Sequence, residues 1–323
     1  MPVEGRTILL TGASEGTGLS AARILASKGA DIIIVSRNNP AKLSQAIDAI
    51  TKAAKWPDTQ RFHAIPADVS EPGYAAGVVA AATAWNNGYP PEIVWCVAGL
   101  SYPMLWSEDD ALRATRRTME VNFFGSAEMS HAILRAWLRN TPAPEEKTAR
   151  LSKHIIFTGS VLSVFSMAGY ATYCPSKFAL RGLIDALAME MRLHPDVPIE
   201  VHLVLPTAIQ TAGFEVENKT KPQITKKLEE SDKPQDPDTV ARVAIASLEK
   251  GHHLITTSFI GDLMRWGALS NSPRNNWLID TLMGWIMPLI LAFTMWNMNS
   301  EVSSWGRKKR AGSAQALSHK IAE

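Results

Sequence analysis

The sequence predicts an α/β protein built on a doubly wound parallel sheet, with a separate apolar segment near the C-terminal end. Short β-branched apolar runs alternate with longer helical stretches over the first two thirds of the chain, as in successive βαβ units. These runs are apolar on both sides, which is typical of strands buried between two helix layers. The first run leads directly into a glycine-rich turn that opens a helix.

Six apolar runs are predicted as strands, and amphipathic stretches between them are predicted as helices. The strands are expected at residues 7–10, 31–35, 61–65, 93–97, 154–158 and 200–205. The helices include residues 18–28, 41–54, 74–85, 108–139 and 175–193. A polar, proline-containing stretch at 140–152 interrupts the alternation and is predicted as a surface loop.

Bulk composition narrows the possible functions. Of 323 residues, 46% are hydrophobic and 20% charged, a globular composition that can bury a sizeable core. The net charge is +2, so no basic excess favours nucleic-acid binding. Cys96 and Cys174 lie far apart, so we expect buried thiols in a reducing compartment rather than a disulfide framework. No apolar leader precedes the first strand, so no signal peptide is expected.

The turn after the first strand predicts a nucleotide phosphate site. Glycine lets the backbone approach a pyrophosphate closely, and the following helix N-terminus directs its free N–H groups at the anion. A glycine triplet alone is a weak signal, and its place between the first strand and the first helix makes it stronger. The candidate cofactor residues in this turn are Gly12, Ser14, Glu15, Gly16 and Gly18.

The end of the second strand favours NADP over NAD. An NAD site usually places an acidic residue there, whereas this chain has Ser36, Arg37 and Asn38. A guanidinium can pair with a 2′-phosphate and stack on adenine. The alternative is a surface arginine after a strand. Asp68 and Val69 after the third strand are expected at the adenine.

Ala98 and Gly99 follow the fourth strand, where small residues let a cofactor lie against the backbone.

A second group of residues predicts carbonyl reduction. Tyr173 and Lys177 are four apart, so on a helix they share a face, and a nearby ammonium lowers the pKa of a phenol. Tyr173 is therefore expected to act as a general acid. Ser160, which precedes Tyr173 by thirteen residues, can hold the carbonyl oxygen as charge develops on it. Asn122 is expected to order a proton-relay water near Lys177. Ser163 is an alternative carbonyl-holding serine, although its spacing is less suitable.

Together, these motifs resemble the short-chain dehydrogenase/reductase family over roughly residues 5–260. The resemblance implies a Rossmann fold and an Asn122, Ser160, Tyr173 and Lys177 tetrad. It also implies hydride transfer from NADPH to a carbonyl carbon, with Lys177 holding the nicotinamide ribose as well. Pro206 and Thr211, after the sixth strand, match the family segment at the nicotinamide amide. The chain departs from the family's common Asn-Asn-Ala-Gly stretch, because Cys96-Val97 precedes Ala98-Gly99.

Four stretches are similar to the 3-ketodihydrosphingosine reductase branch of that family. They are Val35-Ser36-Arg37-Asn38, residues 121–126, residues 173–182, and the Gly-Phe…Glu-Asn-x-Thr-Lys-Pro pattern at 211–222. This resemblance implies NADPH-dependent reduction of 3-ketosphinganine to sphinganine, at a site that faces the cytosol from the endoplasmic reticulum membrane. The substrate amine would be cationic, and Glu215 or Glu217 is a candidate partner for it.

Two other functions stay open at this point. One is reduction of another lipophilic ketone, such as a steroid, retinoid or fatty acyl ketone. The other is a catalytically silent nucleotide-binding scaffold, against which the complete tetrad argues. A homodimer or homotetramer through the helices at 108–139 and 175–193 is implied by the family. No metal site is predicted, because His252 and His253 are adjacent and no carboxylate cluster frames them.

The chain is expected to divide into a catalytic domain at 1–260 and a membrane-associated tail at 261–323. Within the first, the Lys/Glu-rich stretch 211–238 is either a substrate lid or a solvated helix. Within the tail, residues 277–298 are long and apolar enough for membrane association, spanning or interfacial, although a core or dimer-forming helix is the alternative. The basic cluster at 307–310 and tryptophans near the tail favour a cytoplasm-facing membrane surface.

Overall fold

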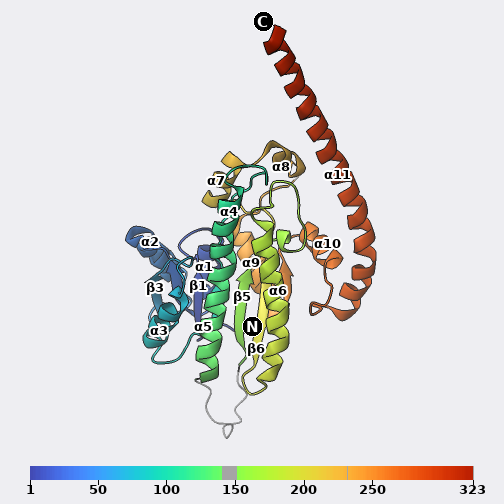
Figure 1. The fold of residues 1–323 in the computed structure, drawn as a ribbon. Helices are drawn as coiled ribbons and strands as arrows, with labels where there is room; N and C mark the ends of the chain where they lie inside the picture. Colours follow the sequence, from blue (N-terminus) through green and yellow to red (C-terminus); the bar gives the residue numbers. More distant parts are fainter. Residues whose placement is uncertain (140–150, 231, 323) are drawn as a thin grey trace.

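The computed structural model describes residues 1–139, 151–230 and 232–322, with side chains up to Lys309. A seven-stranded parallel sheet lies at its centre, in the order β3-β2-β1-β4-β5-β6-β7 (Figure 1). The strands are β1 (Thr7–Thr11), β2 (Asp31–Ser36), β3 (Phe62–Pro66), β4 (Ile93–Cys96), β5 (Lys153–Thr158), β6 (Ile199–Leu205) and β7 (Leu254–Thr256). The predicted doubly wound parallel sheet is thus confirmed.

Helices cover both faces of the sheet. One face packs on α1 (Gly16–Ser27), α2 (Pro40–Thr51) and α9 (Pro237–Glu249). The other packs on α3 (Tyr74–Trp85), α5 (Gly125–Arg139) and α6 (Cys174–Glu190), with Trp137 fully buried in this layer. Because the strands are enclosed on both faces, all of β1 and the centre of β2 are buried, as the apolar runs predict.

The structure differs from the predicted elements in two places. Strand β7 is not among the predicted strands, because its three residues are too few to give a pattern. The predicted helix at 108–139 is three consecutive segments: α4 (Ala111–Thr118), a π-helical turn (Met119–Phe124) and α5. Most of the predicted loop at 140–152 lies outside the described residues.

Two short helices, α7 (Ala212–Thr220) and α8 (Gln223–Leu228), lie across the carboxyl ends of the strands, at the top of Figure 1. They occupy the stretch expected as lid or solvated helix. No side chain of α7 is buried, whereas Ile224 and Thr225 of α8 are buried. Of the two helices, α8 is therefore the one with residues buried against the domain.

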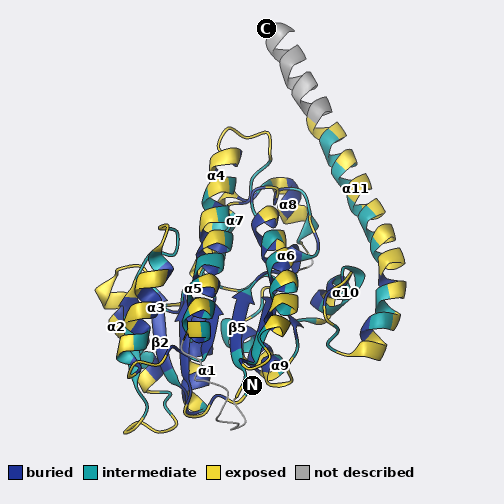
Figure 2. Cartoon of the chain, turned by 60° about the horizontal axis from the view of Figure 1, so that its bottom comes forward, coloured by how far each residue is buried: buried dark blue, intermediate teal, exposed yellow. Residues whose placement is uncertain are grey.

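The C-terminal region consists of α10 (Phe259–Gly267) and the long helix α11 (Trp277–Ala322), which runs beside the molecule and extends past α8 (Figures 1 and 2). Its Asp280 is buried and forms a bidentate ion pair with Arg265 of α10, at 2.9 and 3.1 Å. Asp280 therefore faces protein rather than lipid. Within the described residues, one helix, Trp277–Lys309, is long and apolar enough to cross a membrane. The division at residue 260 stays a prediction, and Leu269 beyond it belongs to the domain core.

Candidate active site

The glycine turn between β1 and α1 packs closely against the segment that follows β4. Gly12 has a φ of +67°, and a Cβ on it would lie 2.6 Å from the Cα of Ala98. Only glycine satisfies both the left-handed backbone and this close approach. Thr11 also stabilises the contact between the glycine turn and the segment after β4, because its Oγ1 accepts hydrogen bonds from the backbone N–H groups of Val97 and Ala98.

The helix N-terminus that the turn opens is the expected place for a pyrophosphate. Helix α1 begins at Gly16, whose φ is +56°, and a Cβ there would lie 3.3 Å from Cγ2 of Thr211. Gly16 and Thr211, which are nearly 200 residues apart in sequence, are thus close neighbours in the fold. The side chain of Glu15 accepts a hydrogen bond from Lys42 Nζ at 2.9 Å and is exposed, so only its backbone is placed to meet a phosphate.

The residues predicted for the adenosine half lie where β2 and β3 end. Ser36 Oγ is 2.8 Å from Ser14 Oγ, which joins the end of β2 to the glycine turn. Arg37 is exposed beside it. Asp68 accepts hydrogen bonds from both the backbone and the hydroxyl of Ser70. Burial alone would raise the pKa of Asp68, but these bonds and the charges of Arg117 and Arg37 lower it overall.

Asn38 is exposed, and among the described residues it has no contact with the glycine turn. The backbone carbonyl of Val69, the other residue predicted for this half, lies close to Gly125.

Asn122 lies in the π-helical turn and is fully buried. Its side chain accepts a hydrogen bond from Leu100 N at 2.8 Å and donates to Leu100 O and to Ser176 Oγ. A Cβ on Gly99 would lie 3.3 Å from Asn122 Oδ1 and 3.5 Å from Lys177 Nζ. The predicted members Asn122, Gly99 and Lys177 are therefore neighbours. Single π-turns inside helices are frequent at functional sites.

Ser160 follows β5 by two residues and caps a short 3₁₀ turn (Val161–Ser163). Its Oγ accepts a hydrogen bond from Leu162 N, and it lies 3.4 Å from Pro206 O, to which it donates. Ser163 Oγ instead accepts the backbone N–H of Ser160 at 3.2 Å. Ser163 thus stabilises the turn, and Ser160 is the serine whose hydroxyl also contacts Tyr173.

Tyr173 and Lys177 lie one turn apart at the start of α6, as their spacing predicts. Lys177 Nζ is 5.6 Å from the centre of the Tyr173 ring and donates a hydrogen bond to Thr158 O at 2.9 Å. Burial lowers the pKa of Lys177 to about 7. Burial also raises the pKa of Tyr173, and the charge of Glu217 adds to this rise, although a hydrogen bond with Ser160 partly offsets it.

The expected lowering of the Tyr173 pKa is thus not found in the chain by itself, because burial and the charge of Glu217 outweigh the hydrogen bond with Ser160. Tyr173 is protonated at neutral pH, which is the state that a proton donor needs.

An acidic cluster beside Tyr173 was only partly anticipated. The Tyr170 hydroxyl lies 2.7 Å from Oε1 of Glu217 and 2.7 Å from Oε1 of Glu229. Lys221 is buried and forms ion pairs with both carboxylates, at 3.1 and 2.6 Å. The Tyr170 and Tyr173 rings are 5.9 Å apart. Of the two predicted acids, Glu217 is therefore close to the candidate site, whereas Glu215 is exposed on α7.

Several residues of the site were missed by sequence reasoning. Thr11, Ser176 and Tyr170 lie within four residues of predicted positions, so their neighbourhood was the available signal. No feature of the sequence indicated Glu229, because its position beside Tyr170 depends on how α8 folds back over the sheet.

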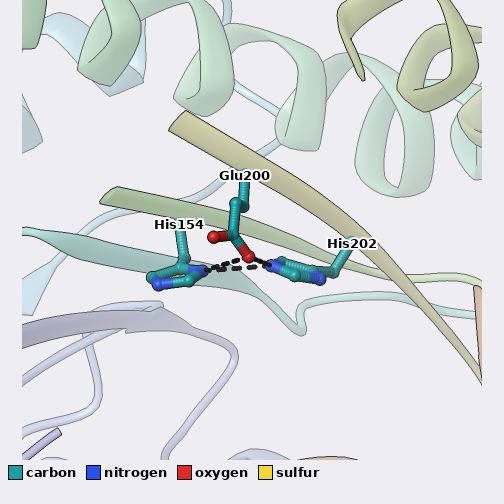
Figure 3. A group of neighbouring side chains, drawn as sticks. All are labelled: His154, Glu200 and His202. Atoms are coloured by element: carbon teal, nitrogen blue, oxygen red, sulfur yellow. Dashed lines mark hydrogen bonds and ion pairs between the residues drawn. The ribbon is translucent and has the colours of Figure 1, made fainter. Parts of the chain in front are cut away.

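A different group of titratable side chains lies at the opposite, amino edge of the sheet, on β5 and β6 (Figure 3). Among the described residues, His154, Glu200 and His202 are the one set of three whose ligand atoms converge closely enough for a metal ion. His154 Nδ1 and His202 Nε2 are 3.1 Å apart, and each is 3.8 Å from Glu200 Oε2.

Hydrogen bonding between two neutral imidazoles accounts for this pair. His202 Nδ1 donates to His252 O at 2.7 Å, so its Nε2 is free to accept the proton of His154 Nδ1. Burial lowers the pKa of His154 to about 2 and that of His202 to about 4. The charges of Arg6 and the N-terminal amine lower the pKa of His154 further, and the same charges would oppose a metal cation.

His253, for which the sequence predicts no metal-binding role, is buried beside β7, where it contacts Asp185 and Val201 O.

The two cysteines, by contrast, are both free and buried, as expected.

Comparison with known proteins agrees with this geometry. The short chain dehydrogenase family model matches residues 6–222. A 3-ketodihydrosphingosine reductase of Neurospora crassa is 55% identical, covering 96% of this chain and 84% of its own. One of Aspergillus fumigatus is 39% identical, covering 98% of this chain and 88% of its own.

Solved structures share the fold. A short chain dehydrogenase from Burkholderia cenocepacia, in complex with NADP, superimposes with a TM-score of 0.62 at 20% identity, covering 84% of this chain and 95% of its own. The family model matches two thirds of the sequence, a range that includes the glycine turn, Ser160, Tyr173 and Lys177. The chain therefore belongs to the short-chain dehydrogenase family.

Proposed function

We infer that this chain is a 3-ketodihydrosphingosine reductase, which reduces the ketone of that lipid to an alcohol. The observation that carries this conclusion is the similarity to two 3-ketodihydrosphingosine reductases, which runs through nearly the whole chain and includes α7, α8 and most of the C-terminal helix. The neighbouring positions of Ser160, Tyr173 and Lys177 support the same reaction, because carbonyl reduction needs a hydrogen-bond donor and a proton donor at one oxygen.

The cofactor that we propose is NADPH. The family takes NAD or NADP, and the choice for this chain rests on Ser36 and Arg37 at the end of β2. The left-handed backbone of Gly12 and Gly16 at the start of α1, and the position of Gly99 beside Lys177, suit a dinucleotide that passes from the glycine turn to Lys177. Pro206, next to Ser160, and Thr211, next to Gly16, are proposed to border the nicotinamide end of this path. When bound, the reduced nicotinamide supplies the hydride.

The side chains then have distinct roles. The Ser160 hydroxyl donates a hydrogen bond to the ketone oxygen and stabilises the negative charge that forms there. The Tyr173 hydroxyl transfers its proton to that oxygen as the carbon accepts the hydride, which leaves an alcohol and a tyrosinate. Lys177 holds the cofactor ribose and stabilises the tyrosinate. Asn122 fixes the backbone at Leu100 and so positions the wall of the site opposite Ser160.

The substrate amine is proposed to bind at the acidic cluster of Glu217, Glu229 and Lys221. Two carboxylates share one lysine, so the cluster carries a net negative charge. The Tyr170 hydroxyl lies 2.7 Å from an oxygen of each carboxylate, and it can donate its single proton to only one of them. A cationic amine would supply the missing donor. A Glu217→Gln/Glu229→Gln variant is expected to raise KM for the amine-bearing ketone about tenfold.

Helix α11 is proposed to attach the enzyme to the cytosolic face of the endoplasmic reticulum membrane. Its outer face exposes Trp285, Leu289, Phe293 and Trp296, each at least 64% exposed. Basic residues 307–309 follow on the same helix, which favours an anionic leaflet. A homodimer or homotetramer through α5 and α6 is also proposed. Phe124, which directly precedes α5, and Phe178 on α6 are exposed and support it.

The test is NADPH consumption by the detergent-solubilised protein with 3-ketosphinganine, and with NADH in a parallel reaction. We expect turnover with NADPH and at most weak turnover with NADH. Turnover of a steroid or simple fatty acyl ketone in place of the sphingoid ketone would move the assignment to another lipophilic substrate. NADPH binding without turnover of any ketone would instead favour a silent scaffold.

A further inference from the structure

An apolar cluster surrounds the start of α6 and joins the candidate site to the C-terminal helix. Its buried members are Val161, Leu162, Phe165, Tyr170 and Cys174. Five partly buried side chains pack against them: Met167, Tyr173, Met264, Met295 and Met298. The proposed proton donor and two residues of α11 therefore belong to one cluster. The long helix is in this way part of the surroundings of the reaction centre as well as a membrane attachment.

Four of the five partly buried side chains in this cluster are methionines. The four methionines come from three separate elements: the loop after β5, α10 and α11. Methionine is unbranched and flexible, so a surface made of it adapts to flexible apolar ligands. Apolar side chains that stay partly exposed beside a reaction centre provide a surface where an alkyl chain can be removed from water.

The two faces of α11 differ, which shows that these methionines are not part of the outward apolar surface. Met295 and Met298 are half-buried and lie on the side of the helix that contains Asp280 and the buried Met287. The outer face is formed by the exposed residues Trp285, Leu289, Phe293 and Trp296. One turn beyond Met298, Glu301 pairs with Lys227 of α8 at 2.8 Å. This contact fixes the inner face of α11 next to the helices that cover the site.

We propose that Met264, Met295 and Met298 bind the alkyl chain of the lipid substrate, so that the inner face of α11 is a wall of the substrate site. This inference rests on the proposed function and adds to it the residues that recognise chain length. Tyr170, which binds the acidic cluster, and the three methionines all belong to the apolar cluster that contains Tyr173. A substrate with its amine at the acidic cluster and its alkyl chain at the methionines would place its ketone near Ser160 and Tyr173.

The test uses the full-length chain in detergent and compares two ketones with the same amine-bearing head, one with a long alkyl chain and one with a short chain. A Met295→Trp/Met298→Trp variant fills the proposed surface. We expect kcat/KM for the long-chain ketone to fall about tenfold, against less than twofold for the short-chain ketone, because each buried methylene strengthens binding about fourfold. The matched control, Leu289→Trp, adds the same ring on the outer face and should change neither value.

The outcomes separate the inference from the proposed function. If the wild-type chain reduces neither ketone, both the inference and the proposed function are overturned. If the wild-type chain reduces both ketones, equal losses for the two ketones in the tryptophan variant, or no loss, overturn the role of α11 alone. If that variant does not fold, Met295→Ala/Met298→Ala takes its place. Its kcat/KM should fall about fivefold for the long-chain ketone only, with NADPH binding as the check that the domain is intact.

Discussion

Titratable side chains are buried at both the carboxyl and the amino edge of the sheet, but the partners of these side chains differ between the two edges. At the carboxyl edge, Tyr173 and Lys177 lie one helical turn apart, close to Gly99 and Ser160, with pKa values shifted by burial. At the amino edge, burial also lowers the pKa values of His154 and His202, but the two imidazoles bond to each other and to His252 O. Burial and a shifted pKa therefore do not identify an active site by themselves.

The sharpest test of this comparison is Tyr173→Phe. Loss of the hydroxyl removes the proposed proton donor and is expected to lower kcat by about a hundredfold to ten-thousandfold. NADPH affinity, measured by fluorescence titration, should stay within a factor of a few, because the hydroxyl is not needed for the glycine turn to bind phosphate. Turnover within tenfold of wild type would remove Tyr173 as the acid.

Ser160→Ala tests the second contact to the substrate oxygen. We expect kcat to fall about a hundredfold or more, as for loss of one donor to a developing oxyanion. Ser163→Ala is the matched control. Because Ser163 only accepts the backbone N–H of Ser160, its loss should lower stability by about 1 kcal/mol with a smaller effect on kcat. The reverse order of the two effects would assign the ketone to Ser163.

The histidine pair should affect stability rather than turnover. Both folded pKa values are lowered, so the unfolded chain takes up protons first, and stability is lost as the pH falls below about 6.5. Between pH 6.5 and 5.5 the two residues together should contribute a loss of about 2 kcal/mol. Urea unfolding of wild type and of His154→Asn/His202→Asn across this range measures it.

The variant should lose less stability than wild type over the same pH interval and keep its kcat at pH 7.5. Parallel pH dependences would show that the imidazoles are not neutral in the folded protein. A loss of activity would instead connect the amino edge to the site.

Arg37→Ala is expected to have the smallest effect. Removing the guanidinium should raise KM for NADPH about tenfold and leave KM for NADH nearly unchanged, because only the former carries the 2′-phosphate. The ratio of the two values is the measurement. An equal rise for both cofactors would point to adenine stacking, and no change would make Arg37 an ordinary surface residue.

The carboxyl edge was predictable because each of its motifs is local in sequence. The glycine turn, Ser36-Arg37 and the Tyr173–Lys177 pair each follow a recognisable strand or open a helix, and parallel strands bring their carboxyl ends to one side. The residues not predicted depend on tertiary placement. Glu229 reaches Tyr170 only because α8 folds over the sheet, and Asp280 finds Arg265 only because α11 docks on α10.

The Arg265–Asp280 pair has a consequence for how the protein is made. Arg265 precedes Asp280 by 15 residues, so the partner leaves the ribosome before the carboxylate that needs it. Until α10 has folded onto β7, the start of α11 carries an uncompensated charge that opposes its entry into lipid. Once the pair has formed, the charge is hidden and the outer tryptophans remain. For the proposed membrane attachment, folding of the domain is therefore expected to precede entry of α11 into the membrane, because only the folded domain compensates the charge of Asp280.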